Sequence, residues 1–543
     1  MSTTADLIAE GRLDEVWSKH CGFLDLDLKQ FMQIQRRLLD EQLELLNRCE
    51  LGSHFFNGRK PKTLEEFREI APLTMYYDYL DLLKPDKADI LPAPPMLWMR
   101  TSGRTGEYGP KWVPCTRAFY DQIARYLIGT LILASAQNKG EINLRPGDVF
   151  LYTVAPPPYL SGTTIRAVSE IFPFRFVPTI PEAEAMGFQE RIQQGFLRSL
   201  ETGIDFFVGL ASVLLRIGEA FAGGDGGSGM KPSAQLLRPR TLYRLGRAMV
   251  RSRLQKRSLL PKDIWTVKGM VASGMDVQVY KQRIEAMWGI KPLEAYACTE
   301  FGTIALQAWG ARSKGLTLAA ESALWEFIPE AEYRAWRRDP TYKPKALLLD
   351  EVTPGRYVLA GTSFGGGPFI RYIIGDLISV IALNDPEYGI RLPQIVMESR
   401  VDDIIDMASL VLLTERAIWQ AIGTLNLPTM DWIARKEYDH DGEPFLHFYI
   451  EGRHVVTDGL ADAIHQSLID TMEDYATFAA IMKRNPIRVS SLSVGTLQRY
   501  LELKQAEKAD LGHLKPPRIQ PSDAITERLL RISAELAQHP PTH

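Results

Sequence analysis

A glycine-rich stretch near residue 105 has the residue types that bind phosphate. It reads Thr101-Ser-Gly-Arg-Thr-Gly-Glu-Tyr-Gly-Pro-Lys111 and contains three glycines. Backbone N–H groups in such a loop can point into one concavity, and hydroxyl and ammonium groups add donors to it. The predicted nucleotide-binding residues are Thr101, Ser102, Gly103, Thr105, Gly106 and Lys111. The loop is not a Walker A motif, because Trp112 follows Lys111. A glycine-rich surface turn is the alternative.

A second candidate lies where a strand-like run ends, in Tyr296-Ala-Cys-Thr-Glu300. A carboxylate beside a triphosphate can hold Mg²⁺, so Glu300 is the predicted metal ligand. Thr299 could donate a hydrogen bond to the α-phosphate, and the Tyr296 ring could stack on a base. The alternative is an ordinary strand that ends in a polar turn.

Two further residues could bind the rest of a nucleotide. Asp376 stands in Gly-Asp-Leu between apolar runs, where a side chain that only accepts hydrogen bonds suits two ribose hydroxyls. Arg400 could reach ribose or phosphate. The alternatives are an Asx-turn for Asp376 and a surface ion pair for Arg400.

Length and composition set limits on these interpretations. A chain of 543 residues predicts two or more domains. The net charge of −3 gives no support for a nucleic-acid surface or an anionic membrane as partner. Four scattered cysteines and an N-terminus without a secretion signal favour the cytoplasm. The apolar window from Leu127 to Ala136 is too short to cross a bilayer, so we expect a buried helix and no membrane span.

Alternating patterns predict an α/β protein. Short apolar runs at Val149 and Asp205 each end in loop residues and precede helical patterns. Strands that alternate with helices indicate βαβ units and a largely parallel sheet, which binds ligands at the carboxyl ends of its strands. The basic segment from Arg238 to Lys262 could bind a polyanion, but a solvated helix face is the commoner explanation.

The pattern changes after Asp403. A helix from Thr414, strands near Trp432 and His447, and a helix from Leu460 predict a small α+β domain. The predicted domains are therefore residues 1–400, which bind ATP and the acyl substrate, and a mobile C-terminal domain of residues 401–543.

Four motifs occur in a fixed order. They are T-S-G-x-T-G-x(3)-P-K, Y-x-x-T-E, I-G-D-L and S-R-x-D-D. Their order resembles that of the acyl-adenylate-forming enzymes over roughly residues 95–410. The resemblance implies a large adenylate-forming domain with mixed, largely parallel sheets and a small C-terminal α+β domain.

Within that superfamily the chain resembles the acyl-acid amido synthetases of the auxin-responsive-promoter type. Similar segments begin at Phe67, Ala323 and Gly495. The phenylacetate-type CoA ligases share the middle motifs and are the alternative. A third possibility is an inactive scaffold, against which Thr299, Glu300 and Asp376 argue.

The resemblance implies a ligase that uses ATP and Mg²⁺ and forms an acyl-adenylate. Its partners would be a carboxylic acid and an amine, an amino acid or CoA, with no nucleic acid; the sequence leaves the oligomeric state open. The implied catalytic residues are Lys515, Glu300 and Thr299, and the small domain is expected to rotate about Asp402. Candidate acyl-pocket residues are Tyr159, Phe207, Ser212 and Ser273. Arg104 departs from the family pattern, and Cys298 is expected to be a buried side chain and not a nucleophile.

Overall fold

The computed structural model describes most of the chain. The residues outside the description are 1, 101–110, 223–237, 275–276, 340, 402–403, 408–410, 426–430, 441–443, 453–458, 473–474, 477, 480–483, 507–516 and 539–543. The chain divides into two compact units, Met1–Met397 and Glu398–His543.

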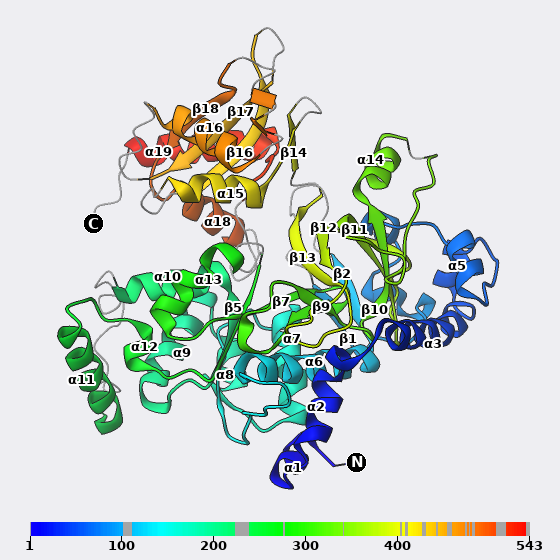
Figure 1. Cartoon of the computed structure of the whole chain (residues 1–543), viewed down its shortest axis with the longest axis horizontal. Coiled ribbons are helices and arrows are strands. Elements are labelled where there is room, and N and C mark those ends of the chain that lie inside the picture. The colour runs from blue at the N-terminus through cyan, green and yellow to red at the C-terminus, as the bar shows by residue number, and fades with distance from the viewer. Residues whose placement is uncertain are drawn as a thin grey trace. The chain divides into compact units, whose positions relative to one another are not determined.

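An 11-stranded mixed sheet organises the first unit (Figure 1). Its strands, in spatial order, are β10 (Ala323–Pro329), β11 (Gly355–Ser363), β12 (Tyr372–Ala382), β13 (Gln394–Arg400), β9 (Leu316–Leu318), β8 (Gly302–Gln307), β7 (Leu293–Cys298), β6 (Gly269–Ser273), β5 (Phe206–Leu210), β3 (Val149–Leu151) and β4 (Arg175–Val177). The strands β4, β3, β5, β6 and β7 run parallel, and β7 to β9 and β10 to β12 pair antiparallel. The mixed α/β fold class is confirmed.

Helices connect the parallel strands and pack on both faces of that half of the sheet. Phe206 lies within 3 Å of where a side chain on Gly269 would stand, next to the end of α6 (Arg117–Ser135). Its neighbour Phe207 points to the other face, where it contacts Phe196 of α9 (Phe188–Thr202) and Trp288 of α13 (Val277–Trp288). Burial on both faces explains why this strand is continuously apolar.

The helix α6 confirms the prediction for the apolar window that begins at Leu127. Its N-cap is Thr116, whose side chain accepts a hydrogen bond from the backbone N–H of Phe119. Residues 128–135 are all buried. No helix among the described residues is long and apolar enough to span a membrane.

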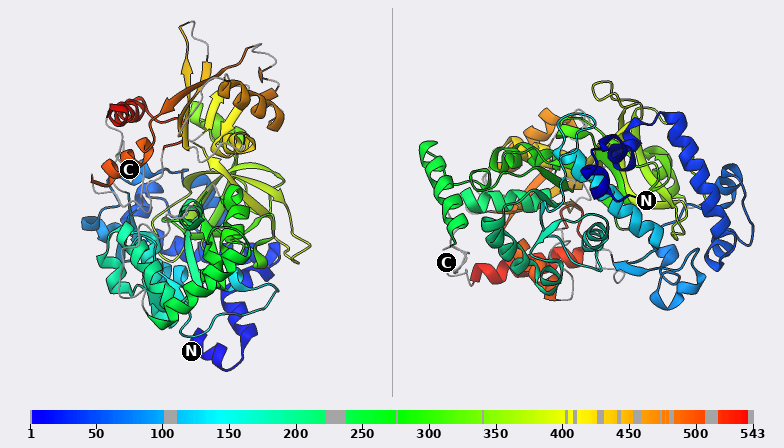
Figure 2. Two further views of the ribbon diagram at one scale, coloured as in Figure 1. Left: turned by 90° about the vertical axis from the view of Figure 1, so that its left-hand side faces the viewer. Right: turned by 90° about the horizontal axis from the view of Figure 1, so that it is seen from below.

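Several helices come before the sheet in the chain, and further helices lie between its strands. The helices of this unit not yet named are α1 (Thr4–Ala9), α2 (Leu13–Cys21), α3 (Leu28–Leu46), α4 (Glu50–Phe55), α5 (Leu64–Ile70), α7 (Leu160–Ile171), α8 (Ile180–Ala185), α10 (Ala211–Ala222), α11 (Pro239–Leu254), α12 (Pro261–Ile264) and α14 (Glu330–Arg338). The helices α3 and α11 lie at opposite ends of the unit (Figures 1 and 2). A hairpin of β1 (Leu97–Arg100) and β2 (Trp112–Cys115) flanks the glycine-rich stretch.

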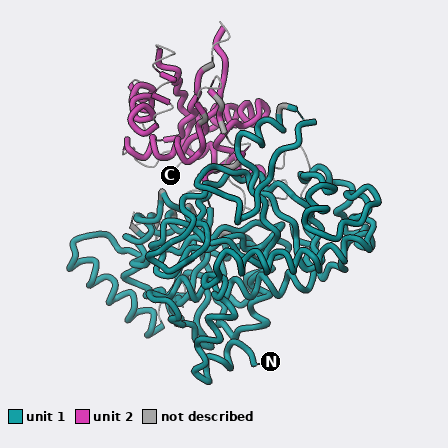
Figure 3. Tube along the Cα trace, turned by 45° about the vertical axis from the view of Figure 1, so that its right-hand side comes forward, with its two compact units in different colours: residues 1–397 teal, residues 398–543 magenta. Residues whose placement is uncertain are grey.

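The second unit has its own core (Figure 3). Its strands are β14 (Ile404–Met407), β15 (Val411–Thr414), β16 (Asp431–Tyr438), β17 (Pro444–Glu451) and β18 (Ile487–Leu492). Its helices include α15 (Glu415–Thr424), α16 (Leu460–Thr471), α18 (Thr496–Ala506) and α19 (Asp523–Gln538). The expected strands and helices near Thr414, Trp432, His447 and Leu460 are all present. The roles predicted for the two domains stay predictions.

Candidate active site

The candidate site is built on one edge of the parallel strands. Ser273 ends β6 and pairs with Leu210 of β5, while Thr299 and Glu300 follow β7 directly. Because these three strands are adjacent and parallel, their carboxyl ends meet at the same edge. Ser273, Thr299 and Glu300 are all partly exposed there. The edge therefore presents a carboxylate and hydroxyl groups to a ligand.

Glu300 accepts a hydrogen bond from another strand of the sheet. The hydroxyl group of Tyr372, the first residue of β12, donates to Oε1 of Glu300 at 3.2 Å. Among the described residues, no group of three or more His, Cys, Asp or Glu side chains could hold a metal. One carboxylate nevertheless fits Mg²⁺, which is bound in many proteins by one or two carboxylates together with substrate phosphates and water.

Tyr76 links the end of the glycine-rich stretch to Glu300. Its hydroxyl group accepts a hydrogen bond from the Trp112 backbone N–H at 2.6 Å. The Nζ atom of Lys111 lies 4.8 Å from the centroid of its ring. Burial raises the pKa of Tyr76 to about 12, and the negative charge of Glu300 acts in the same direction. Lys111 and the Glu300 charge thus both act on this one ring.

Asp376 is oriented by a bulge in β12. Residues 374–376 stand opposite the single residue Leu359, because Val358 pairs with Leu377 and Ala360 with Ile373. Gly375 at the centre of the bulge has φ +87°, a conformation that residues with a Cβ rarely adopt. Asp376 then accepts a 2.6 Å hydrogen bond from the hydroxyl group of Tyr296, and both side chains are buried.

The thiol between these carboxylates is not a nucleophile. Burial raises the pKa of Cys298 well above its usual value, and the charges of Glu300 and Asp376 raise it further. The thiol is therefore protonated at neutral pH, whereas nucleophilic attack requires the thiolate. The raised pKa agrees with the expectation that Cys298 is not a nucleophile, but its side chain is only partly buried, not buried as expected.

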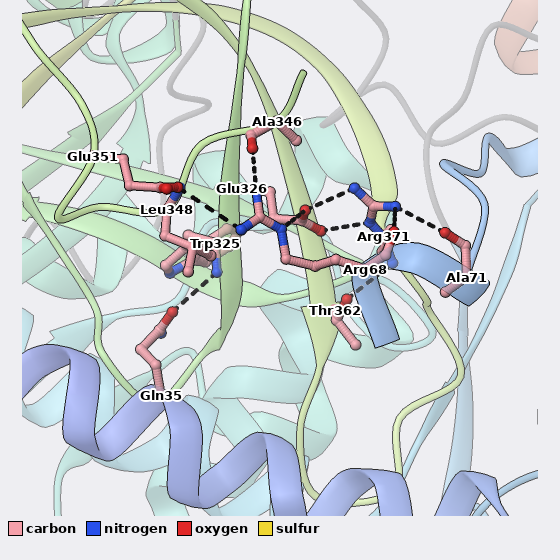
Figure 4. A network of polar contacts seen from close by, with 10 residues as sticks. All are labelled: Gln35, Arg68, Ala71, Trp325, Glu326, Ala346, Leu348, Glu351, Thr362 and Arg371. Carbon is pink, nitrogen blue, oxygen red and sulfur yellow. Dashed lines mark hydrogen bonds and ion pairs between the residues drawn. The ribbon is translucent and has the colours of Figure 1, made fainter. Parts of the chain in front are cut away.

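A buried ion-pair network holds the segment that carries Tyr372 (Figure 4). Arg371 has φ +42°, which is uncommon for a residue other than glycine. Its guanidinium donates two hydrogen bonds, of 2.9 and 2.8 Å, to Glu326, which is fully buried. Nε of Arg68 lies 3.6 Å from the same carboxylate. A bidentate pair of this kind fixes the orientation of both side chains.

The end of α5 and the segment between it and η2 (Tyr76–Tyr79) hold the same turn through their backbone. Arg371 donates to the carbonyl oxygens of Arg68 and Ala71 at 3.0 and 2.8 Å. Thr74 donates its N–H to the Arg371 carbonyl at 3.1 Å and accepts from Ile373 at 2.8 Å. The residues that carry Tyr76 therefore also position Tyr372.

The predicted acyl-pocket residues have different surroundings. Tyr159 is the N-cap residue of α7 and is 7% exposed. Phe207 is fully buried in an aromatic cluster with Phe196 and Trp288, so it could contact a substrate only if that cluster opened. Ser212 lies in the first turn of α10, and Ser273 is at the carboxyl edge. Their substrate-binding roles stay predictions.

Several predicted site residues cannot be placed. Thr101, Ser102, Gly103, Thr105, Gly106 and Lys515 lie outside the described residues, as do Arg104 and Asp402. Arg400 ends β13 in the second unit, and the description does not include its side chain. Two hydrogen bonds thus join the end of β7 to β12, one from Tyr296 to Asp376 and one from Tyr372 to Glu300, and Lys111 lies beside the Tyr76 ring.

Sequence reasoning missed Tyr76, Tyr372, Arg371 and Glu326. A signal existed for two of them, because Arg371 and Tyr372 stand just before the I-G-D-L motif, separated from it by Ile373, in an otherwise apolar segment. Tyr76 lies in a segment that was used only for the family resemblance. Glu326 carried no signal beyond being a charged residue in an apolar strand.

Comparisons with known proteins confirm the fold. Residues 21–175 match the model of the GH3 family N-terminal domain. A structure of a GH3.15 acyl acid amido synthetase in complex with 2,4-DB is similar with a TM-score of 0.65 and 15% identity, over 92% of this chain and 93% of that one. A 2-hydroxyisobutyryl-CoA ligase in the postadenylation state with R3-HIB-AMP gives a TM-score of 0.54 and 16% identity, over 91% and 92%. No curated protein sequence matches the chain. The GH3 match over residues 21–175 and the shared fold agree with the resemblance stated from the sequence.

Proposed function

We propose that this chain is an ATP-dependent ligase that activates a carboxylic acid as an acyl-adenylate and transfers the acyl group to an amine or amino acid. The observation that carries the proposal is the pair of hydrogen bonds that joins the segment of Tyr296 and Glu300 to β12, which carries Asp376, with Lys111 at the end of the glycine-rich stretch beside the Tyr76 ring. The shared fold and the GH3 segment support it.

In the first half-reaction, a carboxylate oxygen of the acid attacks the α-phosphorus of ATP, and the bond to the bridging oxygen of pyrophosphate breaks. Two anions must approach each other, so the site has to supply positive charge and hydrogen-bond donors. We assign Thr299 to the α-phosphate and Lys111, with the hydroxyl and glycine residues of 101–106, to the outer phosphates. Glu300 would hold Mg²⁺, which would neutralise phosphate charge.

The nucleoside would lie on the Tyr296 and Asp376 side of the site. Asp376 is an acceptor-only group suited to ribose hydroxyls, and its bond from Tyr296 fixes the carboxylate orientation. We assign Arg400 to ribose or phosphate and Lys515 to charge neutralisation during adenylation. Rotation of the second unit about Asp402 would exchange these groups between the two steps.

In the second half-reaction, an amine nitrogen attacks the acyl carbonyl and AMP leaves. The acyl group would lie near Tyr159, Ser212 and Ser273. Transfer to the thiol of CoA is the second candidate, because the fold is also that of the 2-hydroxyisobutyryl-CoA ligase. The two functions share the adenylation step and differ only in the acceptor.

The test is carboxylate-dependent exchange of pyrophosphate into ATP across aromatic and aliphatic acids. Mass spectrometry of products formed with pooled amino acids and with CoA then identifies the acceptor. We expect exchange with a subset of acids and an amide product. A thioester without an amide would replace the first function by the second, and no exchange with any acid would reject both.

A further inference from the structure

The helix α11 presents an apolar stripe to solvent. It lies at the periphery of the first unit, where it packs on α9 and α12 (Figures 1 and 2). Five of its side chains are large, hydrophobic and exposed: Leu242 (53%), Tyr243 (72%), Met249 (54%), Val250 (58%) and Leu254 (79%). Of the large hydrophobic side chains that are exposed among the described residues, no other element carries as many. A monomeric soluble protein rarely concentrates exposed apolar side chains in this way.

The orientation of α11 is the reverse of an ordinary surface helix. The stripe occupies positions i, i+1, i+7, i+8 and i+12, which lie on one face at 3.6 residues per turn. The buried residues are the small Thr241, Ala248 and Ser252, on the opposite face. A helix that packs only for the stability of the unit would bury its leucines and expose its hydroxyl groups. The stripe is therefore available for something outside the chain.

Basic side chains flank the stripe. The segment from 238 to 262 contains nine basic residues and no acidic residue, although the whole chain has a net charge of −3. Three arginines are engaged within the unit: Arg238 pairs with Glu201, Arg244 donates to the Ser199 carbonyl at 3.0 Å, and Arg257 pairs with Asp263.

Four further arginines of α11, and Lys256 just after its end, face solvent. Arg240, Arg247, Arg251, Arg253 and Lys256 are exposed, and no described acidic residue forms an ion pair with them. The apolar stripe favours contact with an apolar phase, and the cations beside it favour contact with negative charge. A partner with a negatively charged surface over an apolar interior would satisfy both.

We propose that α11 docks on an anionic phospholipid membrane, with its apolar stripe inserted at the level of the headgroups. A nucleic acid would use the cations but would leave the stripe in water. The bilayer interface accepts both the apolar residues and the cations, and Tyr243 is of a type enriched at that depth. The helix is about 24 Å long, which suits a helix lying in the membrane plane and not crossing it.

The inference changes an expectation from the sequence. The neutral charge balance of the chain argued against an anionic membrane, and a solvated helix face was the commoner explanation of the basic segment. The structure shows the basic face and adds an apolar stripe that solvation does not explain. Local charge decides attraction over a distance of about one Debye length, ~8–10 Å, so the net charge of the chain has little influence.

The test uses the full-length protein and flotation with vesicles of phosphatidylcholine alone or of phosphatidylcholine with phosphatidylserine, whose negative charge attracts basic segments. We expect binding only to the anionic vesicles, and weaker binding as salt is raised. The variant Arg247→Gln with Arg251→Gln should bind about 25-fold more weakly, at roughly fivefold per basic residue. The variant Tyr243→Ser with Val250→Ser should lose roughly tenfold.

Matched variants test whether the effect belongs to α11. Arg37→Gln with Arg48→Gln removes two exposed arginines, one on α3 and one just after its end, whose side chains are 63% and 76% exposed. Leu383→Ser with Val494→Ser removes two exposed apolar side chains elsewhere. Both controls should bind like the wild type. All variants should keep the wild-type melting temperature and pyrophosphate exchange, since no residue of the candidate site is changed.

Other outcomes overturn the proposal. Absence of wild-type binding to the anionic vesicles at about 0.1 M salt rejects it, and so does an equal loss in the control variants. Sedimentation velocity distinguishes a second copy of the chain as the occupant: a wild-type dimer that the Tyr243→Ser and Val250→Ser variant converts to monomers, without vesicle binding, would assign the stripe to self-association.

Discussion

Two glutamates of one sheet, Glu326 in β10 and Glu300 after β7, use their carboxylates in opposite ways. Glu326 is fully buried, accepts two hydrogen bonds from Arg371 and has Arg68 within 3.6 Å. Glu300 is partly exposed, and among the described residues its one hydrogen bond comes from the neutral hydroxyl group of Tyr372. The carboxylate of Glu326 is neutralised by arginines of the protein and stabilises the fold. The carboxylate of Glu300 has no such partner among the described residues and can bind a cation from outside.

The two glutamates are connected through adjacent residues. Arg371 binds Glu326 and the next residue, Tyr372, binds Glu300. The ion pair of Arg371 and Glu326 therefore positions Tyr372, which in turn orients the carboxylate of Glu300. This division can be tested by asking whether each substitution affects stability, activity or both.

The largest effect on stability is expected for Glu326→Gln. The substitution would leave the Arg371 guanidinium buried without its counter-charge, which typically costs about 3–5 kcal/mol. Urea unfolding should show this loss. Glu41→Gln is the matched control, since its pair with Arg37 is exposed and should contribute less than about 1 kcal/mol. If Glu326→Gln kept its stability but lost exchange activity, Glu326 would belong to the site and the comparison would fail.

Glu300→Ala should show the reverse pattern. Pyrophosphate exchange is expected to fall by about 10²- to 10³-fold, the usual cost of removing one preorganised electrostatic contact. The melting temperature should stay close to that of the wild type, because the side chain is partly exposed. Glu44→Gln, an exposed carboxylate on α3, serves as the control. Exchange at the wild-type level would remove Glu300 from the reaction.

Acid should destabilise the protein through His20, which like Glu326 is buried and makes its hydrogen bonds within the protein. Its Nδ1 donates to the Arg125 carbonyl, and its Nε2 lies 2.9 Å from the Thr4 hydroxyl group, which can donate to the neutral ring. Burial lowers its pKa to about 4. The unfolded chain, with a pKa near ~6.5, binds the proton first, so stability falls between about pH 6.5 and pH 4 by roughly 3 kcal/mol.

His20→Gln measures that contribution. Its unfolding free energy should depend less on pH across this window than that of the wild type. The exposed His54 provides the matched control, and His54→Gln should keep the wild-type slope. Equal slopes in the wild type and in His20→Gln would contradict the assignment of a neutral buried ring.

The smallest effect is expected for Tyr296→Phe. Loss of its hydroxyl group leaves the Asp376 carboxylate without one hydrogen bond, which is worth about 1 kcal/mol or roughly fivefold in KM for ATP. Tyr342→Phe changes an exposed tyrosine and should leave KM unchanged. An unchanged KM in Tyr296→Phe would indicate that the ribose does not depend on this orientation of Asp376.

Much of the framework could be predicted from local patterns. The helix over the apolar window from Leu127 and the strand that follows Asp205 were predicted, because apolar runs act within a few residues. The loop residues 101–106 and Lys515 were also predicted, and they lie outside the described residues. The hairpin of β1 and β2 was not expected, since pairing between strands is not encoded by either strand alone.

The sequence by itself determined the chemistry available at the site, because residue types and motif order identify Glu300, Asp376 and Lys111 as candidates without any coordinates. Only the tertiary structure placed Tyr76 and Tyr372 beside Glu300 and paired Arg371 with Glu326, because these contacts join segments far apart in the chain. The same holds for α11: its periodicity defines an apolar stripe, but only packing against α9 and α12 decides that Tyr243 and Val250 face outward.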